Sequence, residues 1–189
     1  MKKLLTSALA LTLAFSPATY ANDESKGMSM MQSSPHAAKA PYDIQYLDTM
    51  AEHHREGIKM FQMAVDKAQS QELRDKAQMM IDAQKKEIPE LKAMRDEIKP
   101  NAPEAINMKM PGMMMMDMSK LESSSGKDFD HHFIDMTIKH HQGALDMSRD
   151  ALKHAKSQQV KKQAQMIIDM QTKEITEMKT MLKKIKSNY

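Results

Sequence analysis

Methionines gather in one short stretch of this chain, between residues 108 and 118. The seven are Met108, Met110, Met113, Met114, Met115, Met116 and Met118. Thioether sulfur is a soft, uncharged donor that suits Cu(I) and Ag(I) and offers little to Mg²⁺, Ca²⁺ or Zn²⁺. Methionine also fills gaps in hydrophobic cores, as we expect for Met79 and Met166 in helical stripes, but this run stands among Pro, Gly, Lys and Asp. We interpret the run as a soft-metal site, with an adaptable docking surface or an oxidant sink as alternatives.

Two pairs of adjacent histidines are the second candidate site, His53–His54 and His140–His141. Adjacent helical residues diverge by about 100°, so the two histidines of a pair do not easily share one ion. We expect one histidine of each pair to face the core and the other to face a flank. His54 and His141 fall on the apolar stripe, where a buried imidazole needs a hydrogen-bond partner or a metal.

Side chains on the neighbouring helices could meet that need: Gln84, Glu87, Gln171 and Glu174. Glutamate and histidine facing inward also build di-metal carboxylate sites in helix bundles, usually with a Glu-x-x-His spacing on one helix. Neither histidine pair has a glutamate three residues before it. Two interpretations therefore stay open, a buried His–Glu or His–Gln pair and a metal-ligand role.

The second histidine pair continues a ladder of histidine and methionine side chains. His132, Met136 and His140 are four residues apart, which places them on one helical face, and Met147 follows seven residues later. Such a ladder suits copper, because imidazole accepts both oxidation states and thioether favours Cu(I). A solvated flank is the plain alternative. Further candidate ligands lie closer to the N-terminus: Met28, Met30, Met31 and His36.

An internal repeat organises the elements that carry these residues. His53 and His140 differ by 87 positions (140 − 53). The same offset aligns Asp43 with Asp130, Met60 with Met147 and Glu87 with Glu174, and no gap is needed. Repetition of this kind indicates a duplicated helical hairpin.

Apolar residues at helical spacing predict four helices, over about 42–70, 71–99, 127–156 and 158–186. Short breaks within each pair and a longer break between pairs predict an all-α, antiparallel four-helix bundle made of two duplicated hairpins. Pro89 is expected to kink or locally break the second helix. The predicted organisation is a signal peptide at 1–21, a flexible leader at 22–41, a first hairpin at 42–99, a methionine-rich linker at 100–126 and a second hairpin at 127–189.

The first residues have the pattern of a signal peptide. Lys2 and Lys3 precede an apolar run over 4–15, which is short for a membrane span, and small residues end at Ala21. Cleavage after about Ala21 predicts a periplasmic or secreted bacterial protein with no membrane span. The chain has no cysteine, so soft-metal chemistry must rest on methionine and histidine. Without Lys2 and Lys3 the net charge falls from +3 to +1, which gives no electrostatic basis for nucleic-acid binding.

At these residues the chain resembles a family of exported bacterial helical domains, the domain of unknown function 305. The resemblance rests on Phe133, Met136, His140-His-Gln-Gly-Ala144, Ala164, Ile168, Gln171-x-x-Glu-Ile175 and Met178, with a weaker copy at His53-His-Arg-Glu-Gly57 and Gln84-x-x-Glu-Ile88. It implies a ferritin-like fold. The better understood members are similar to CopM-type periplasmic copper-binding proteins, so the resemblance implies binding of Cu(I) and Ag(I) in support of copper tolerance. The first repeat departs at Glu56, where the second has Gly143.

We therefore expect an exported protein that binds Cu(I), and also Ag(I), without catalysing a reaction. A copper efflux or acceptor protein would be its partner. One alternative is a ferritin-like di-metal oxidase or store that holds iron or manganese with His54, His141, Glu87 and Glu174. The other is a helical interaction module that binds a protein partner without metal.

Overall fold

A computed structural model of the chain describes residues 32–187, in which helices are the only regular secondary structure. The order is η1 (Ala37–Lys39), α1 (Tyr42–Lys67), α2 (Gln71–Ile98), α3 (Ser119–Ser123), α4 (Gly126–His154) and α5 (Gln158–Ser187). The all-α prediction is confirmed. No helix within 32–187 is long and apolar enough to cross a membrane.

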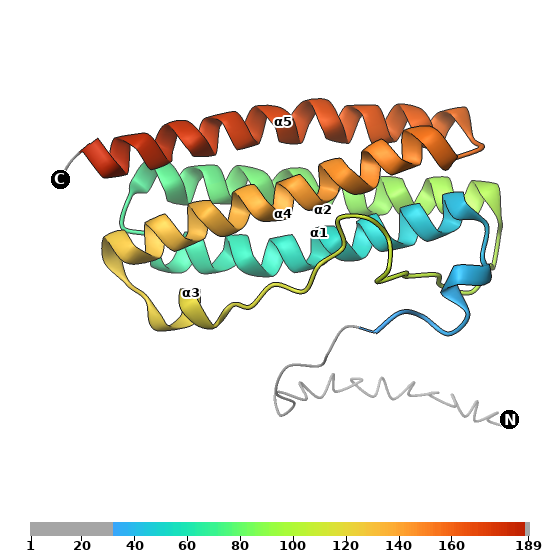
Figure 1. Cartoon of the computed structure of the whole chain (residues 1–189), viewed down its shortest axis with the longest axis horizontal. Helices are drawn as coiled ribbons and strands as arrows, with labels where there is room; N and C mark the ends of the chain where they lie inside the picture. The colour runs from blue at the N-terminus through green and yellow to red at the C-terminus, as the bar shows by residue number, and fades with distance from the viewer. Residues whose placement is uncertain (1–31, 188–189) are drawn as a thin grey trace, which may run out of the picture. The chain divides into compact units, whose positions relative to one another are not determined.

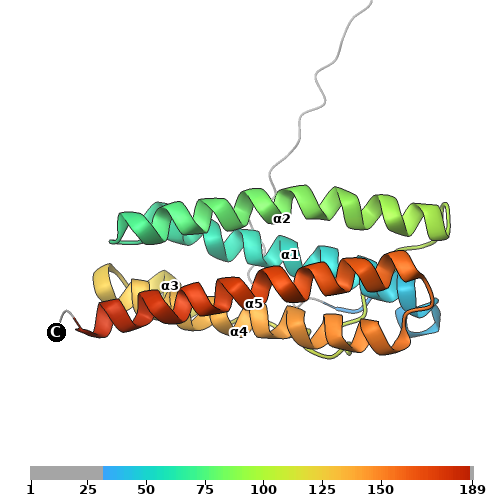
Figure 2. The same cartoon turned by 90° about the horizontal axis from the view of Figure 1, so that it is seen from above.

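The four long helices form two hairpins, because only three residues separate α1 from α2 and α4 from α5. In Figures 1 and 2, α1 lies beside α2, α4 lies beside α5, and α1 and α4 bring the hairpins together. Ser70 caps α2, since its hydroxyl accepts from the Leu73 N–H at 3.4 Å. α2 continues through Pro89 without interruption, so the helix is not broken there, and the alternative of a kink stays a prediction. Pro89 and Lys85 are exposed, and water can satisfy the Lys85 carbonyl that loses its bond.

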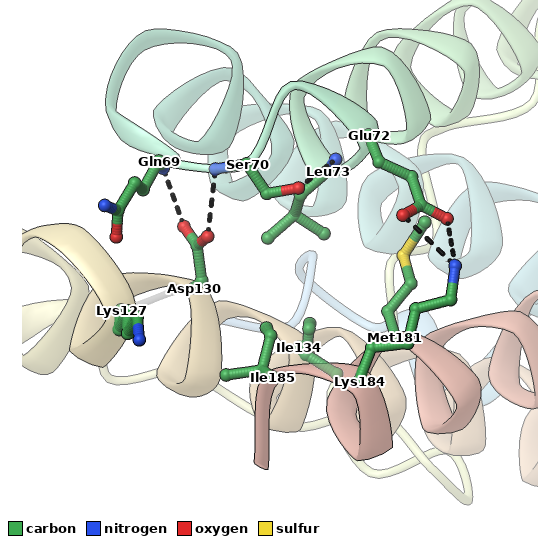
Figure 3. A pocket seen from close by; sticks show the side chains of 10 residues that line it. All are labelled: Gln69, Ser70, Glu72, Leu73, Lys127, Asp130, Ile134, Met181, Lys184 and Ile185. Atoms are coloured by element: carbon green, nitrogen blue, oxygen red, sulfur yellow. Dashed lines mark hydrogen bonds and ion pairs between the residues drawn. The ribbon is translucent and has the colours of Figure 1, made fainter. Parts of the chain in front are cut away.

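Each hairpin is tied to the turn of the other by one aspartate. Asp130 on α4 accepts hydrogen bonds from the backbone N–H groups of Gln69 and Ser70, at 2.9 and 3.0 Å (Figure 3). Its counterpart Asp43 on α1 accepts from the N–H groups of residues 156 and 157, at 2.9 and 3.2 Å. All these positions are related by the offset of 87, so the two halves of the fold are joined by equivalent contacts.

The hydrophobic core consists of two large clusters along the helices and a small third cluster of Ala37, Ile44 and Ala105. One large cluster lies near the α4–α5 turn and includes Tyr46, Leu91 and Ala164. The other large cluster lies near the α1–α2 turn and includes Phe61, Ile81 and Phe133. The chain segments between these clusters carry the histidine pairs with Gln84 and Gln171, which we call the histidine layer. A polar layer thus interrupts the core midway along the helices.

Candidate metal centre

All four histidines of the two pairs are buried. The exposed fractions are 2% for His53, 0% for His54, 2% for His140 and 0% for His141. The expectation that one histidine of each pair faces a flank is therefore wrong. His54 and His141 face the partner helix of their own hairpin, whereas His53 and His140 face each other between α1 and α4. The contact between the hairpins buries the faces of α1 and α4 that carry His53 and His140.

The rings of His53 and His140 are stacked, with centroids 3.9 Å apart and planes 11° apart. Burial lowers the pKa of His53 to about 3, with further lowering from His54 and His141 and weak opposition from the His140 backbone. Burial also lowers the pKa of His140 well below its ordinary value, and the neighbouring histidines add to this effect. Both rings are therefore neutral at physiological pH, and neutral imidazole is the form that binds metals.

The histidine layer contains polar atoms that lack hydrogen-bond partners within residues 32–187. They include both ring nitrogens of His53, Nε2 of His140, the amide oxygens of Gln84 and Gln171, and the Thr137 hydroxyl. Buried polar atoms are normally paired, because leaving one unpaired costs about 1–3 kcal/mol. Several unpaired polar atoms in one buried layer indicate a binding site for a ligand or an ion.

His54 and His141, the histidines that face the partner helix of their own hairpin, are paired with glutamates. One of the two interpretations of the sequence predicts such pairs. His54 Nε2 lies 2.7 Å from Glu87 Oε2. His141 Nε2 lies 3.1 Å from Glu174 Oε2, a contact within ion-pair distance that is not a hydrogen bond. Burial raises the pKa of Glu174, but His141 and Lys76 outweigh burial and hold it below its ordinary value. The Nδ1 atoms of both histidines remain buried and unpartnered among the described residues.

Glycines provide the room for this layer. A Cβ atom on Gly57 would lie 2.5 Å from His140 Nε2 and 2.7 Å from Gln84 Oε1. A Cβ atom on Gly143 would lie 2.4 Å from the carbonyl oxygen of Gly112 and 3.4 Å from His53 Nε2. Gly112, at φ +78°, lies in the methionine-rich linker. The linker backbone therefore crosses α4 directly beside His53, a contact that the sequence did not predict.

Hydrogen bonds to α1 hold the first half of the linker in place. Asp48 accepts from the Ala105 N–H at 2.8 Å, and the Thr49 hydroxyl accepts from the Asn107 N–H at 2.9 Å. Asp48 also pairs with the Arg95 guanidinium at 3.3 Å. The linker is thus a fixed cover over the α1–α4 interface between residues 105 and 112.

The linker methionines divide between the two core clusters and the surface. Met110 is buried and Met113 is half-buried, and both pack in the cluster that contains Met147. Met116 and Met118 are half-buried and pack with Met136 against the other cluster. Met108 is also half-buried, while Met114 and Met115 are 47% and 48% exposed.

The remaining candidate residues lie elsewhere. His132 is half-buried on α4 and His36 is exposed. Met28, Met30 and Met31 lie outside the described residues. Met79 and Met166, expected in the core, are 63% and 51% exposed on equivalent positions of α2 and α5. Their neighbours Met80 and Ile167 fill the core instead, since adjacent helical residues diverge by about 100°.

A pocket of about 270 Å³ lies at the α1–α2 turn (Figure 3), away from the histidine layer. Its acidic groups are already engaged, Asp130 by two backbone N–H groups and Glu72 by Lys184 at 2.9 Å. Within residues 32–187, no three His, Asp or Glu side chains are arranged to hold one metal ion. The candidate ligands that the structure brings into direct contact are the imidazoles of His53 and His140.

Fold and site together define a class, a helical protein whose hairpins bury histidine pairs beneath a methionine-rich linker. The sequence matches the family described as domain of unknown function (DUF305) over residues 14–95 and 43–182, and the chain belongs to this family. This confirms the resemblance seen in the sequence. No curated protein matches the chain.

Several solved structures are similar to this chain. CopM in its Cu(II)-bound form has 31% sequence identity and a TM-score of 0.66, covering 75% of this chain and 96% of CopM. CopM in its Cu(I)-bound form has 29% identity and a TM-score of 0.64 over the same shares. A DUF305 protein of Streptomyces coelicolor, described as secreted, has 21% identity and a TM-score of 0.69, covering 80% of this chain and 96% of its own, and shows likeness of fold.

Proposed function

We propose that this protein is an exported carrier or scavenger of Cu(I) and Ag(I) that supports copper tolerance. Its two duplicated hairpins form an antiparallel four-helix bundle of ferritin type around the ion. The proposal describes binding rather than catalysis, and a copper efflux or acceptor protein would receive the cargo.

The observation that carries the proposal is the set of unpartnered nitrogens of His53 and His140 beneath the linker. Burial lowers the pKa of both rings, to about 3 for His53, so each ring is neutral at physiological pH and keeps a free lone pair. Imidazole with thioether favours copper, and a monovalent ion with neutral ligands carries less charge into the core than a divalent one. Met110 and Met113 lie in the linker segment that crosses this site.

Similarity to CopM supports the same function. CopM has been crystallised in Cu(I)-bound, Cu(II)-bound and Ag-bound forms. The di-metal alternative has weaker support. Its four groups form two separate His–Glu pairs, and the described residues bring no three such groups around one point.

An anaerobic Cu(I) competition titration against a chromogenic chelator tests the proposal. We expect the mature wild-type protein to compete, and the double variant His53→Phe/His140→Phe to lose its tightest ion. Replacement of Met113, Met114, Met115, Met116 and Met118 by Leu should remove further ions or weaken their binding. The matched control Met79→Leu/Met166→Leu changes two exposed methionines elsewhere and should bind like the wild type. If the wild type fails to compete, the copper proposal is wrong.

A further inference from the structure

One face of α4 lies under the second half of the linker. His132, Met136 and Gly143 are spaced by four and seven residues, so they share this face, which we call the linker face. Gly143 is in backbone contact with Gly112 of the linker. His132 and Met136 are half-buried, so something other than solvent covers part of each side chain.

The path of the linker identifies that cover. It touches Gly143 at Gly112, and nine residues later Leu121 of α3 packs in the cluster of Phe129 and Phe133. On α4, residues 143 and 129 are about 21 Å apart, which nine residues can span. The linker therefore runs toward the N-terminal end of α4, as Figure 1 shows for the yellow segment before α3.

Burial separates the linker methionines that pack on the core from those that face solvent. Met116 and Met118 are half-buried and pack against the same cluster as Met136. Met114 and Met115 are instead about half exposed. Three thioethers, two from the linker and one from α4, thus pack against one core cluster, which also contains Phe133, the neighbour of His132.

His132 has a nitrogen available for a ligand. Its Nδ1 atom is buried and has no hydrogen-bond partner in the described part of the chain. The adjacent His131 differs, because its Nδ1 lies 3.4 Å from Asp135. A buried nitrogen without a partner, one helical turn from the Met136 thioether, is not explained by packing alone.

The first repeat uses the equivalent face differently. At the positions of His132 and Met136, α1 carries Gln45 and Thr49. Gln45 accepts from the side chain of Asn107 at 2.7 Å, and Thr49 accepts from its backbone N–H at 2.9 Å. On α1, this face holds the start of the linker by hydrogen bonds. On α4, the equivalent face carries the imidazole of His132 and the thioether of Met136.

We infer that His132 Nδ1 and the sulfurs of Met136, Met116 and Met118 form a second soft-metal site, separate from the histidine layer. The inference rests on the proposed function, since it assigns the same monovalent ions to a further set of ligands. The site is half-buried, so it exchanges ions with solvent more readily than the histidine layer does. All four donors are uncharged when the imidazole is neutral, which suits Ag(I) and Cu(I).

Titration of the mature protein with Ag(I) nitrate, followed by calorimetry and by ¹⁵N NMR of the histidine rings, tests this site. We expect the His132 Nδ1 resonance to shift on Ag(I) addition, and the variant His132→Gln/Met136→Leu to bind one Ag(I) fewer than the wild type. The matched control His131→Gln/Met181→Leu changes a histidine and a methionine in the same region and should keep the wild-type stoichiometry. Circular dichroism verifies that both variants fold.

Two results would overturn the inference. In the first, the wild type and the His132→Gln/Met136→Leu variant bind the same number of Ag(I) ions with the same affinity. The proposed function would then stand, with the histidine layer as its site. In the second, the wild type binds no Ag(I), which would overturn both proposals together.

Discussion

His53 and His140, equivalent residues of the two repeats, stack on each other with ring centroids 3.9 Å apart. A residue can contact its own counterpart only next to the symmetry axis that relates the two copies. The histidine pairs therefore lie where the internal twofold axis passes through the protein. Asp130 and Asp43 join the hairpins through equivalent hydrogen bonds at the two turns. The same axis therefore relates the contacts in the middle of the molecule and those at its two ends.

Acid should destabilise the protein through the stacked histidines. The pKa of His53 is about 3 in the folded state, against an ordinary value of 6.5 in the unfolded chain. Between these values the unfolded state binds more protons, so the free energy of unfolding falls as pH falls, by up to about 1.4 kcal/mol per pH unit for each such histidine. Urea unfolding from pH 7.5 to 4 measures this slope. The variant His53→Phe should have a shallower slope, and equal slopes would contradict the assignment.

Replacing Gly143 by Ala should displace the linker. The new Cβ would meet the Gly112 carbonyl oxygen at 2.4 Å, and backbone cannot yield as a side-chain end does. Alanine is favoured over glycine in a helix by about 1 kcal/mol, so α4 itself should not weaken. We expect faster trypsin cleavage after the exposed Lys109 in the variant, measured by mass spectrometry. Unchanged cleavage would show that the linker does not depend on this contact.

Removing either cross-hairpin aspartate should destabilise the fold. Asp130→Ala leaves the N–H groups of Gln69 and Ser70 without their acceptor, at a cost of about 1–3 kcal/mol. Asp43→Ala should cost a similar amount, because its contacts are equivalent. The two sites lie at opposite ends of the hairpins, so urea unfolding of the double variant should give the sum of the single effects. A cost near zero for either variant would show that these aspartates do not stabilise the contact between the hairpins.

Hydrogen peroxide should oxidise the methionines in order of exposure. Met114 and Met115 are 47% and 48% exposed, whereas Met110 is 5% exposed although it belongs to the same linker. We expect sulfoxide at the first two well before Met110, since access to the sulfur controls the reaction. Peptide mass spectrometry over a time course gives the order. Oxidation of Met110 at the same rate would show that the linker is not packed as described.

Local pattern was sufficient to predict the helices and to offer glutamate as one of the possible partners of His54 and His141. Helical periodicity depends on residues three and four apart, which the sequence displays directly, and the offset of 87 placed equivalent partners in both hairpins. The orientation of His53 was not predictable in this way. Its side chain points off the apolar stripe of α1, and only the docking of α4 buries it.

The sequence by itself thus determined an all-helical, duplicated protein rich in soft donors, with histidine pairs at equivalent positions. Tertiary structure alone decided that His53 stacks on His140 and that Gly112 brings the linker onto α4 at Gly143. The physical reason is the distance along the chain between the residues that interact. Helix formation and amphipathic patterning are local, whereas both contacts join residues 31 (143 − 112) and 87 (140 − 53) positions apart in the chain. Such contacts depend on how whole helices pack and on where a glycine lets two backbones meet.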